Sequence, residues 1–89
     1  MKVLTVEIKN EAGLHARPSS KFVEVTAKYD SEITVHTDNE AVNGKSIMGL
    51  MLLGAEKGKR LKLVANGVDE HQLLEALRQL VEEEKFNEE

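Results

Sequence analysis

Three separate segments of this chain alternate apolar and polar side chains with a period of two, which is typical of a β-strand buried on one face. The apolar positions are Leu4, Val6 and Ile8, then Ile33 and Val35, and finally Leu61, Leu63 and Ala65. Because each segment has only one apolar face, we expect an antiparallel sheet with one face covered and the other open to water.

Between and after these strands, the spacing of apolar residues changes to that of an α-helix. A first helix is predicted over residues 16–28, with Pro18 in its first turn, where a missing N–H is tolerated. A second, short helix over residues 47–53 ends at Gly54, and a third follows Asp69, which can cap it. The residues expected to share one helix face are Ala16, Ser20, Val23 and Ala27 in the first helix and Leu73, Leu77, Leu80 and Val81 in the third.

A short return strand over residues 40–42, after a turn at Asp38 and Asn39, completes the order βαββαβα. We therefore expect an α+β fold, an open-faced two-layer sandwich in which three helices cover one face of a four-stranded antiparallel sheet. At 89 residues the chain has room for one core. A single domain spanning residues 1–89 is predicted, with an acidic C-terminal tail from about Glu82.

Composition narrows the classes of function. The chain has no Cys, which excludes disulfides and thiolate metal sites. Its net charge of -4 argues against binding to nucleic acid or to an anionic membrane surface, since both favour a basic surface. No apolar run is long enough to insert into a membrane, and the first residues lack the features of a signal peptide. We expect a cytoplasmic protein.

The segment over residues 13–18, which reads GLHARP, combines groups suited to phosphate chemistry. His15 is a nucleophile near neutral pH, and a helix start at Ala16, Arg17 and Pro18 offers unpaired N–H groups and the positive end of the helix dipole to an anion. The Arg17 guanidinium can bind phosphate oxygens in a forked geometry. An alternative stays open at this point: His15 caps the helix and Arg17 is a solvated surface charge.

Ser46 opens the second helix and has the residue type of an N-cap, although the same position would suit a regulatory phosphoserine. The helix that follows is apolar nearly all the way round, which a small two-layer domain cannot bury completely. We expect Ile47, Met48 and Met51 to form an exposed docking face for partner proteins. The alternative is a helix sunk in a groove between the other two.

The two motifs together resemble those of the HPr family, the histidine-containing phosphocarriers of the bacterial phosphotransferase system. Residues 13–18 are similar to the family's active-site motif, and residues 43–51, NGKSIMGLM, to its second signature. The resemblance covers almost the whole chain and implies the family's βαββαβα fold. It also implies that enzyme I, charged by phosphoenolpyruvate, phosphorylates the δ1 nitrogen of His15, and that an enzyme IIA protein then receives the group.

The same resemblance implies a contact of Arg17 with the phosphoryl group or its transfer partner. It further implies phosphorylation of Ser46 by an HPr kinase/phosphorylase where one is present, and docking of partners on the second helix. Leu52 is similar to the nitrogen-related branch of the family, whereas Pro18 is more like the sugar branch. A nitrogen-branch carrier of the NPr type and a purely regulatory binding module therefore remain alternatives.

No cofactor is expected. No metal site is expected either, since His15, His36 and His71 lack the spacing of metal ligands. A carrier that presents one histidine to several partners in turn is expected to be a monomer.

Overall fold

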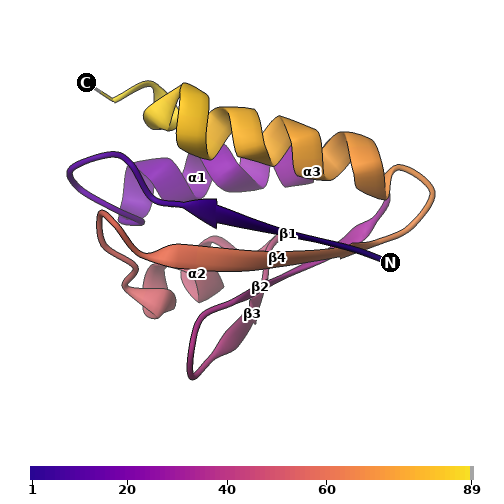
Figure 1. Ribbon diagram of the computed structural model, residues 1–89, viewed down its shortest axis with the longest axis horizontal. Helices are drawn as coiled ribbons and strands as arrows, with labels where there is room; N and C mark the ends of the chain where they lie inside the picture. The colour runs from indigo at the N-terminus through magenta and orange to yellow at the C-terminus, as the bar shows by residue number, and fades with distance from the viewer. Residues whose placement is uncertain (89) are drawn as a thin grey trace.

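The computed structural model describes residues 1–88 and has the predicted order of four strands and three α-helices (Figure 1). The elements are β1 (Lys2–Glu7), α1 (Ala16–Thr26), β2 (Glu32–His36), β3 (Ala41–Asn43), α2 (Ile47–Leu53), β4 (Arg60–Asn66) and α3 (Glu70–Arg78). A π-helical turn at Gln79–Glu83 and a 3₁₀ turn at Lys85–Asn87 follow α3. Glu89, the last residue of the predicted acidic tail, lies outside the described residues.

The strands form one antiparallel sheet in the order β1-β4-β2-β3. Alternation along the strands places their apolar side chains on one face, as β4 shows: Leu61, Leu63 and Ala65 are fully buried, whereas Arg60 and Lys62 are exposed. The predicted α+β sandwich with one wet sheet face is confirmed. No helix in the described part of the chain is long and apolar enough to cross a membrane.

Helix α1 begins where expected but buries a different face. The predicted face of Ala16, Ser20, Val23 and Ala27 is wrong, because Ala16 and Ala27 are exposed and Ser20 and Val23 are only partly buried. The buried residues are Pro18, Ser19, Phe22 and Thr26. Phe22 has far more apolar surface to bury than the small residues that suggested the other phase. The Thr26 hydroxyl donates to the Gly44 carbonyl, which anchors the end of the helix.

Helix α3 has the predicted inward leucines, but Asp69, which precedes it, does not cap it through its side chain. Asp69 occupies the N-cap position without a side-chain capping bond. Its carboxylate instead accepts hydrogen bonds from the Ser31 hydroxyl and from the Asp30 and Ser31 amides. These bonds, that of Ser31 Oγ first, lower the pKa of Asp69. The capping prediction was wrong because tertiary donors at the start of β2 compete for the carboxylate.

The end of the chain packs against the body of the protein. The Glu82 carboxylate accepts a hydrogen bond from the Glu7 amide of β1, at 2.8 Å. Phe86 is fully buried, and Lys21 Nζ of α1 donates to the Phe86 carbonyl at 2.7 Å. In Figure 1 the segment that follows α3 lies at the same end of the molecule as the loop between β1 and α1 and helix α2.

Candidate functional site

The loop before α1 is fixed from both sides. Gly13 has a φ of +71°, and a Cβ there would lie 2.4 Å from the Ala55 carbonyl oxygen. Leu14 is buried, and its amide donates to that same carbonyl at 2.9 Å. On the other side, Asn10 Nδ2 donates to the Gly13 carbonyl at 3.0 Å. Glycine is required here because both the positive φ and the close approach exclude a side chain.

A surface ion pair adds a further tie between this loop and the loop that follows α2. Lys57 Nζ lies 2.6 Å from Glu11 Oε2. The hydrogen bond and charge of Lys57 lower the pKa of Glu11. The loop that carries the candidate histidine is thus joined to the C-terminal side of α2.

His15 occupies the N-cap position of α1, but its side chain makes no capping bond. Its backbone carbonyl accepts the first helical hydrogen bond, from the Ser19 amide at 3.0 Å, while its side chain is 48% exposed. The interpretation that the His15 side chain caps the helix is therefore wrong. The imidazole stands at the helix start with no part in holding the helix together.

The other residues of the predicted helix start, which follow His15 directly, form the first turn of α1 as expected. Ala16 and Arg17 are exposed and Pro18 is buried. Amides in the first turn of a helix have no partner within the helix, so those of Ala16 and Arg17 are available to an anion. No ion pair or side-chain hydrogen bond of Arg17 is found within residues 1–88, so no such contact occupies its guanidinium there.

One residue that sequence reasoning did not select, Glu88, lies against His15, and a second, Asn10, bonds to Glu88. Glu88 Oε2 is 3.5 Å from His15 Nε2, and Glu88 Oε1 accepts a hydrogen bond from Asn10 Nδ2 at 2.9 Å. Asn10 is itself buried. No local pattern could have indicated this contact, because Glu88 belongs to an acidic tail that reads as solvated and reaches His15 only through the tertiary fold.

Ser46 is the N-cap of α2, as predicted. Its hydroxyl oxygen accepts a hydrogen bond from the Gly49 amide at 3.0 Å, and the side chain is partly buried. At the other end, Gly54 adopts the left-handed conformation with a φ of +60° that commonly terminates helices.

Helix α2 has an apolar surface that is open to water. Leu50 is its one buried residue, whereas Met48 is 72% exposed, Met51 43% and Ile47 39%. The alternative of a helix sunk in a groove is therefore wrong. Leu52, which was not among the predicted docking residues, is 75% exposed and enlarges the same helix surface.

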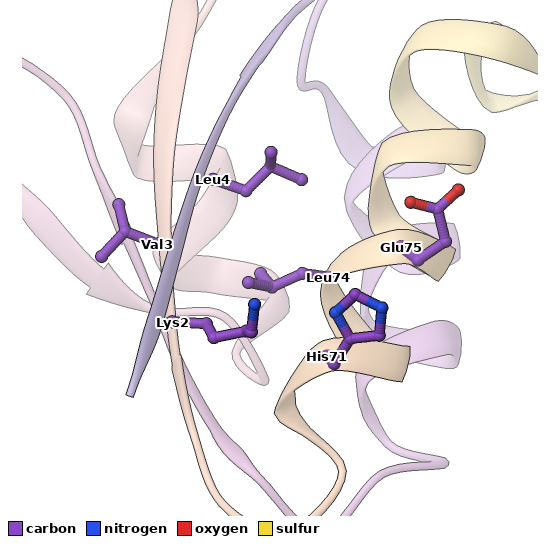
Figure 2. Close-up of a pocket in the computed structure, with 6 residues that line it drawn as sticks. All are labelled: Lys2, Val3, Leu4, His71, Leu74 and Glu75. Atoms are coloured by element: carbon purple, nitrogen blue, oxygen red, sulfur yellow. The ribbon is translucent and has the colours of Figure 1, made fainter.

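The hollow drawn in Figure 2 lies elsewhere, between β1 and α3. It has a volume of about 140 Å³ and contains none of the predicted site residues. Its lining consists of Lys2, Val3, Leu4, His71, Leu74 and Glu75. Within residues 1–88, no group of three or more His, Asp or Glu side chains is arranged to hold a metal ion.

Comparison with known proteins adds independent information. A family model described as the PTS HPr component phosphorylation site matches residues 3–83. The phosphocarrier protein HPr of Neisseria meningitidis serogroup B is 46% identical over 77 residues, which cover 86% of each chain. The HPr-like protein Crh of Bacillus subtilis is 42% identical over 79 residues, covering 89% of this chain and 93% of Crh.

Among solved structures, that of HPr-C-His from Thermoanaerobacter tengcongensis is similar along the whole chain. It superposes with a TM-score of 0.94 at 52% identity, and the match covers 100% of this chain and 99% of the other.

Proposed function

Because this chain belongs to the HPr family of phosphocarriers of the phosphotransferase system, we propose that His15 accepts a phosphoryl group from phosphoenolpyruvate-charged enzyme I and passes it to enzyme IIA proteins for sugar uptake. The observation that carries this proposal is the half-exposed His15 imidazole at the start of α1, with no structural role of its own. A nucleophile with that freedom can react and be presented to a partner without disturbing the fold.

The surroundings of His15 favour one of its two ring nitrogens. Nε2 faces the Glu88 carboxylate at 3.5 Å, and within residues 1–88 no ion pair of Nδ1 with an acidic side chain is found. Approach of a phosphoryl dianion is electrostatically easier on that side. This supports phosphorylation at Nδ1, the position that the family resemblance implies.

Two groups at the helix start would stabilise the phosphoryl group. The amides of Ala16 and Arg17, together with the positive end of the α1 dipole, favour negative charge there. The Arg17 side chain can add charge-assisted hydrogen bonds. Because this region is exposed, the stabilisation is moderate, as a carrier that must release its phosphoryl group requires.

Partners would dock on the exposed surface of α2, which comprises Ile47, Met48 and Met51 and is extended by Leu52. Flexible methionine side chains adapt to differently shaped partners. The hydrogen bond between Leu14 and Ala55 ties the residue before His15 to the segment that follows α2. A partner bound to α2 can therefore also reach His15.

The direct test is incubation with enzyme I and phosphoenolpyruvate, followed by mass spectrometry. We expect one added phosphoryl group that is labile in acid and stable in alkali, and none on His15→Ala. His36→Ala is the matched control, because it removes a histidine of the sheet and should label normally. Absence of labelling in the unaltered protein, or labelling of His15→Ala, would overturn the carrier proposal.

We also propose that Ser46 is a regulatory phosphorylation site for an HPr kinase/phosphorylase. A phosphate at the start of α2 would be tolerated by the helix dipole and would bring about -1.5 to -2 charges next to the docking surface. Incubation with ATP and the kinase should give an acid-stable phosphate that Ser46→Ala lacks. A stable phosphate on Ser46→Ala would place the modification elsewhere.

A second candidate is a regulatory binding module that acts without phosphotransfer, and similarity to Crh favours it. A solved structure of Crh is described as that of the catabolite repression HPr of Bacillus subtilis. The His15 labelling experiment separates the two functions, since only a carrier loses its activity in His15→Ala. A nitrogen-branch carrier would instead label normally but transfer its phosphoryl group to a regulatory rather than a sugar-specific partner.

A further inference from the structure

The last described residues follow an unusual backbone path back to His15. Lys85, Phe86 and Asn87 have φ values of +51°, +57° and +58°, three consecutive side-chain-bearing residues in the left-handed region. Residues with a Cβ rarely adopt this conformation, and such strain persists only where the surrounding structure enforces it.

Two anchors enforce this path. The Phe86 side chain is fully buried, and its carbonyl accepts the hydrogen bond from Lys21 Nζ of α1. Beyond the turn, Asn10 Nδ2 donates to Glu88 Oε1. The turn is thus fixed before Glu88 by Phe86, the Glu88 carboxylate is bonded to Asn10, and the Glu88 side chain is only 19% exposed.

The position of Asn10 decides which Glu88 oxygen faces His15. Because Oε1 accepts from Asn10, Oε2 is the oxygen that faces His15 Nε2. An ionised carboxylate can only accept, so it favours the neutral tautomer in which Nε2 carries the proton. The lone pair of Nδ1 is then free to act as the nucleophile.

We propose that Glu88 is a positioning residue that holds the His15 imidazole as the Nε2–H tautomer, with Nδ1 ready to receive a phosphoryl group. The consequence for transfer rests on the proposed carrier function. When the Nδ1 lone pair forms the N–P bond, the bond from phosphorus to its donor breaks and the donor keeps the electron pair. Nε2 retains its proton, and the positive charge that develops on the ring faces the Glu88 carboxylate, as in other histidine–carboxylate pairs.

Three variants test this role. In Glu88→Gln the amide oxygen must face the Asn10 donor, so the amide NH₂ turns toward His15 Nε2 and favours the wrong tautomer, with the proton on Nδ1. Glu88→Ala removes the carboxylate without adding a donor. Glu84→Gln makes the same change of charge at an exposed position of the same tail and serves as the control.

The first measurement is ¹⁵N NMR of the imidazole nitrogens, recorded at a pH high enough for the imidazole rings to be neutral. His36 and His71 serve as internal references. We expect a shift of the His15 tautomer population toward Nδ1–H in Glu88→Gln, a smaller change in Glu88→Ala, and none in Glu84→Gln. The second measurement is the rate of phosphorylation by enzyme I, which should fall severalfold in Glu88→Gln and less in Glu88→Ala.

Whether Glu88→Gln or Glu88→Ala lowers the rate of phosphorylation more separates a positioning role from a merely structural one. A structural role predicts that Glu88→Ala is the more damaging change, which would overturn the proposal. An unchanged His15 tautomer in Glu88→Gln would also overturn it. If enzyme I labels none of the proteins, including the unaltered one, the carrier function fails, while the tautomer spectra still decide whether Glu88 orients His15.

Discussion

The starts of α1 and α2 carry the two candidate phosphorylation sites, and they use their first residues in opposite ways. At α2 the Ser46 hydroxyl caps the helix, whereas at α1 the His15 side chain makes no capping bond. Helix α1 is instead held by buried side chains, Phe22 and Thr26 among them, while α2 buries only Leu50. Stability at α1 comes from packing, which leaves its first side chain available for chemistry. Stability at α2 depends on its cap, on buried Leu50 and on partly buried Leu53, which leaves the rest of its surface available for partners.

The largest effect is expected at the single buried residue of α2. Replacing Leu50 by Ala leaves a cavity beneath the helix and should lower the free energy of unfolding by about 2–5 kcal/mol. Leu52→Ala, at a 75% exposed position of the same helix, should change it by less than about 0.5 kcal/mol. Urea denaturation measures both. Equal losses of stability in the two variants would contradict the contrast between buried Leu50 and exposed Leu52.

A second contrast concerns two glycines with a positive φ, Gly13 in the loop before His15 and Gly54 at the end of α2. Gly13→Ala combines a positive φ with a Cβ only 2.4 Å from the Ala55 carbonyl, and should cost about 2–4 kcal/mol. Gly54→Ala has a φ of +60° but open space around the Cβ, so it should cost only about 1–2 kcal/mol. If Gly54→Ala proved the more destabilising in urea, the close approach of the His15 loop to Ala55 would be in doubt.

The start of α3 provides a third case, in which the side chain of the N-cap residue bonds to another segment of the chain instead of to its own helix. Asp69→Asn places an NH₂ group among the donors of Asp30 and Ser31 and should lower the midpoint of thermal unfolding by several degrees at pH 7. The pKa of Asp69 is lowered by folding, so its stabilisation is fully present above the unfolded value of about 3.9 and is lost as the pH falls through the lower folded pKa. The difference between the two proteins should therefore shrink below about pH 4. A difference that stays constant down to pH 2 would rule out the ionised carboxylate as its cause.

The smallest effects on stability are expected at the two candidate phosphorylation sites themselves. Ser46→Ala removes a cap and should destabilise the protein by about 1 kcal/mol, whereas His15→Ala should change its stability by less than about 0.5 kcal/mol. Thermal unfolding of both variants under one buffer condition checks this. A His15→Ala variant as unstable as Ser46→Ala would give the imidazole a structural role that the geometry does not show.

Much of this architecture could be predicted because it depends on local signals. Period-two alternation at Leu61, Leu63 and Ala65 set the buried face of β4 correctly. Ser46 and Gly54 marked the ends of α2, since a cap and a left-handed glycine act within a few residues of the helix. The apolar excess of α2 likewise predicted exposed side chains, because a small two-layer domain has no third layer to cover the outer side of its helices.

Other features could not be predicted because they depend on which distant groups meet. Asp69 had the residue type and position of a cap, yet the donors of Ser31 reach it from the start of β2. The face of α1 was misassigned because small residues allowed two phases, and Phe22 decided between them by its contact with the core.

The site at His15 likewise combines features that depend on local sequence with features that depend on distant groups. Residues 13–18 by themselves determined that a histidine stands at a helix start beside Arg17, because helix signals and residue chemistry are local. Only the tertiary structure decided that the imidazole is free of capping and that Glu88 faces its Nε2. That contact joins two segments at opposite ends of the chain, and it depends on burial of Phe86 and a hydrogen bond from Asn10, which no local pattern encodes.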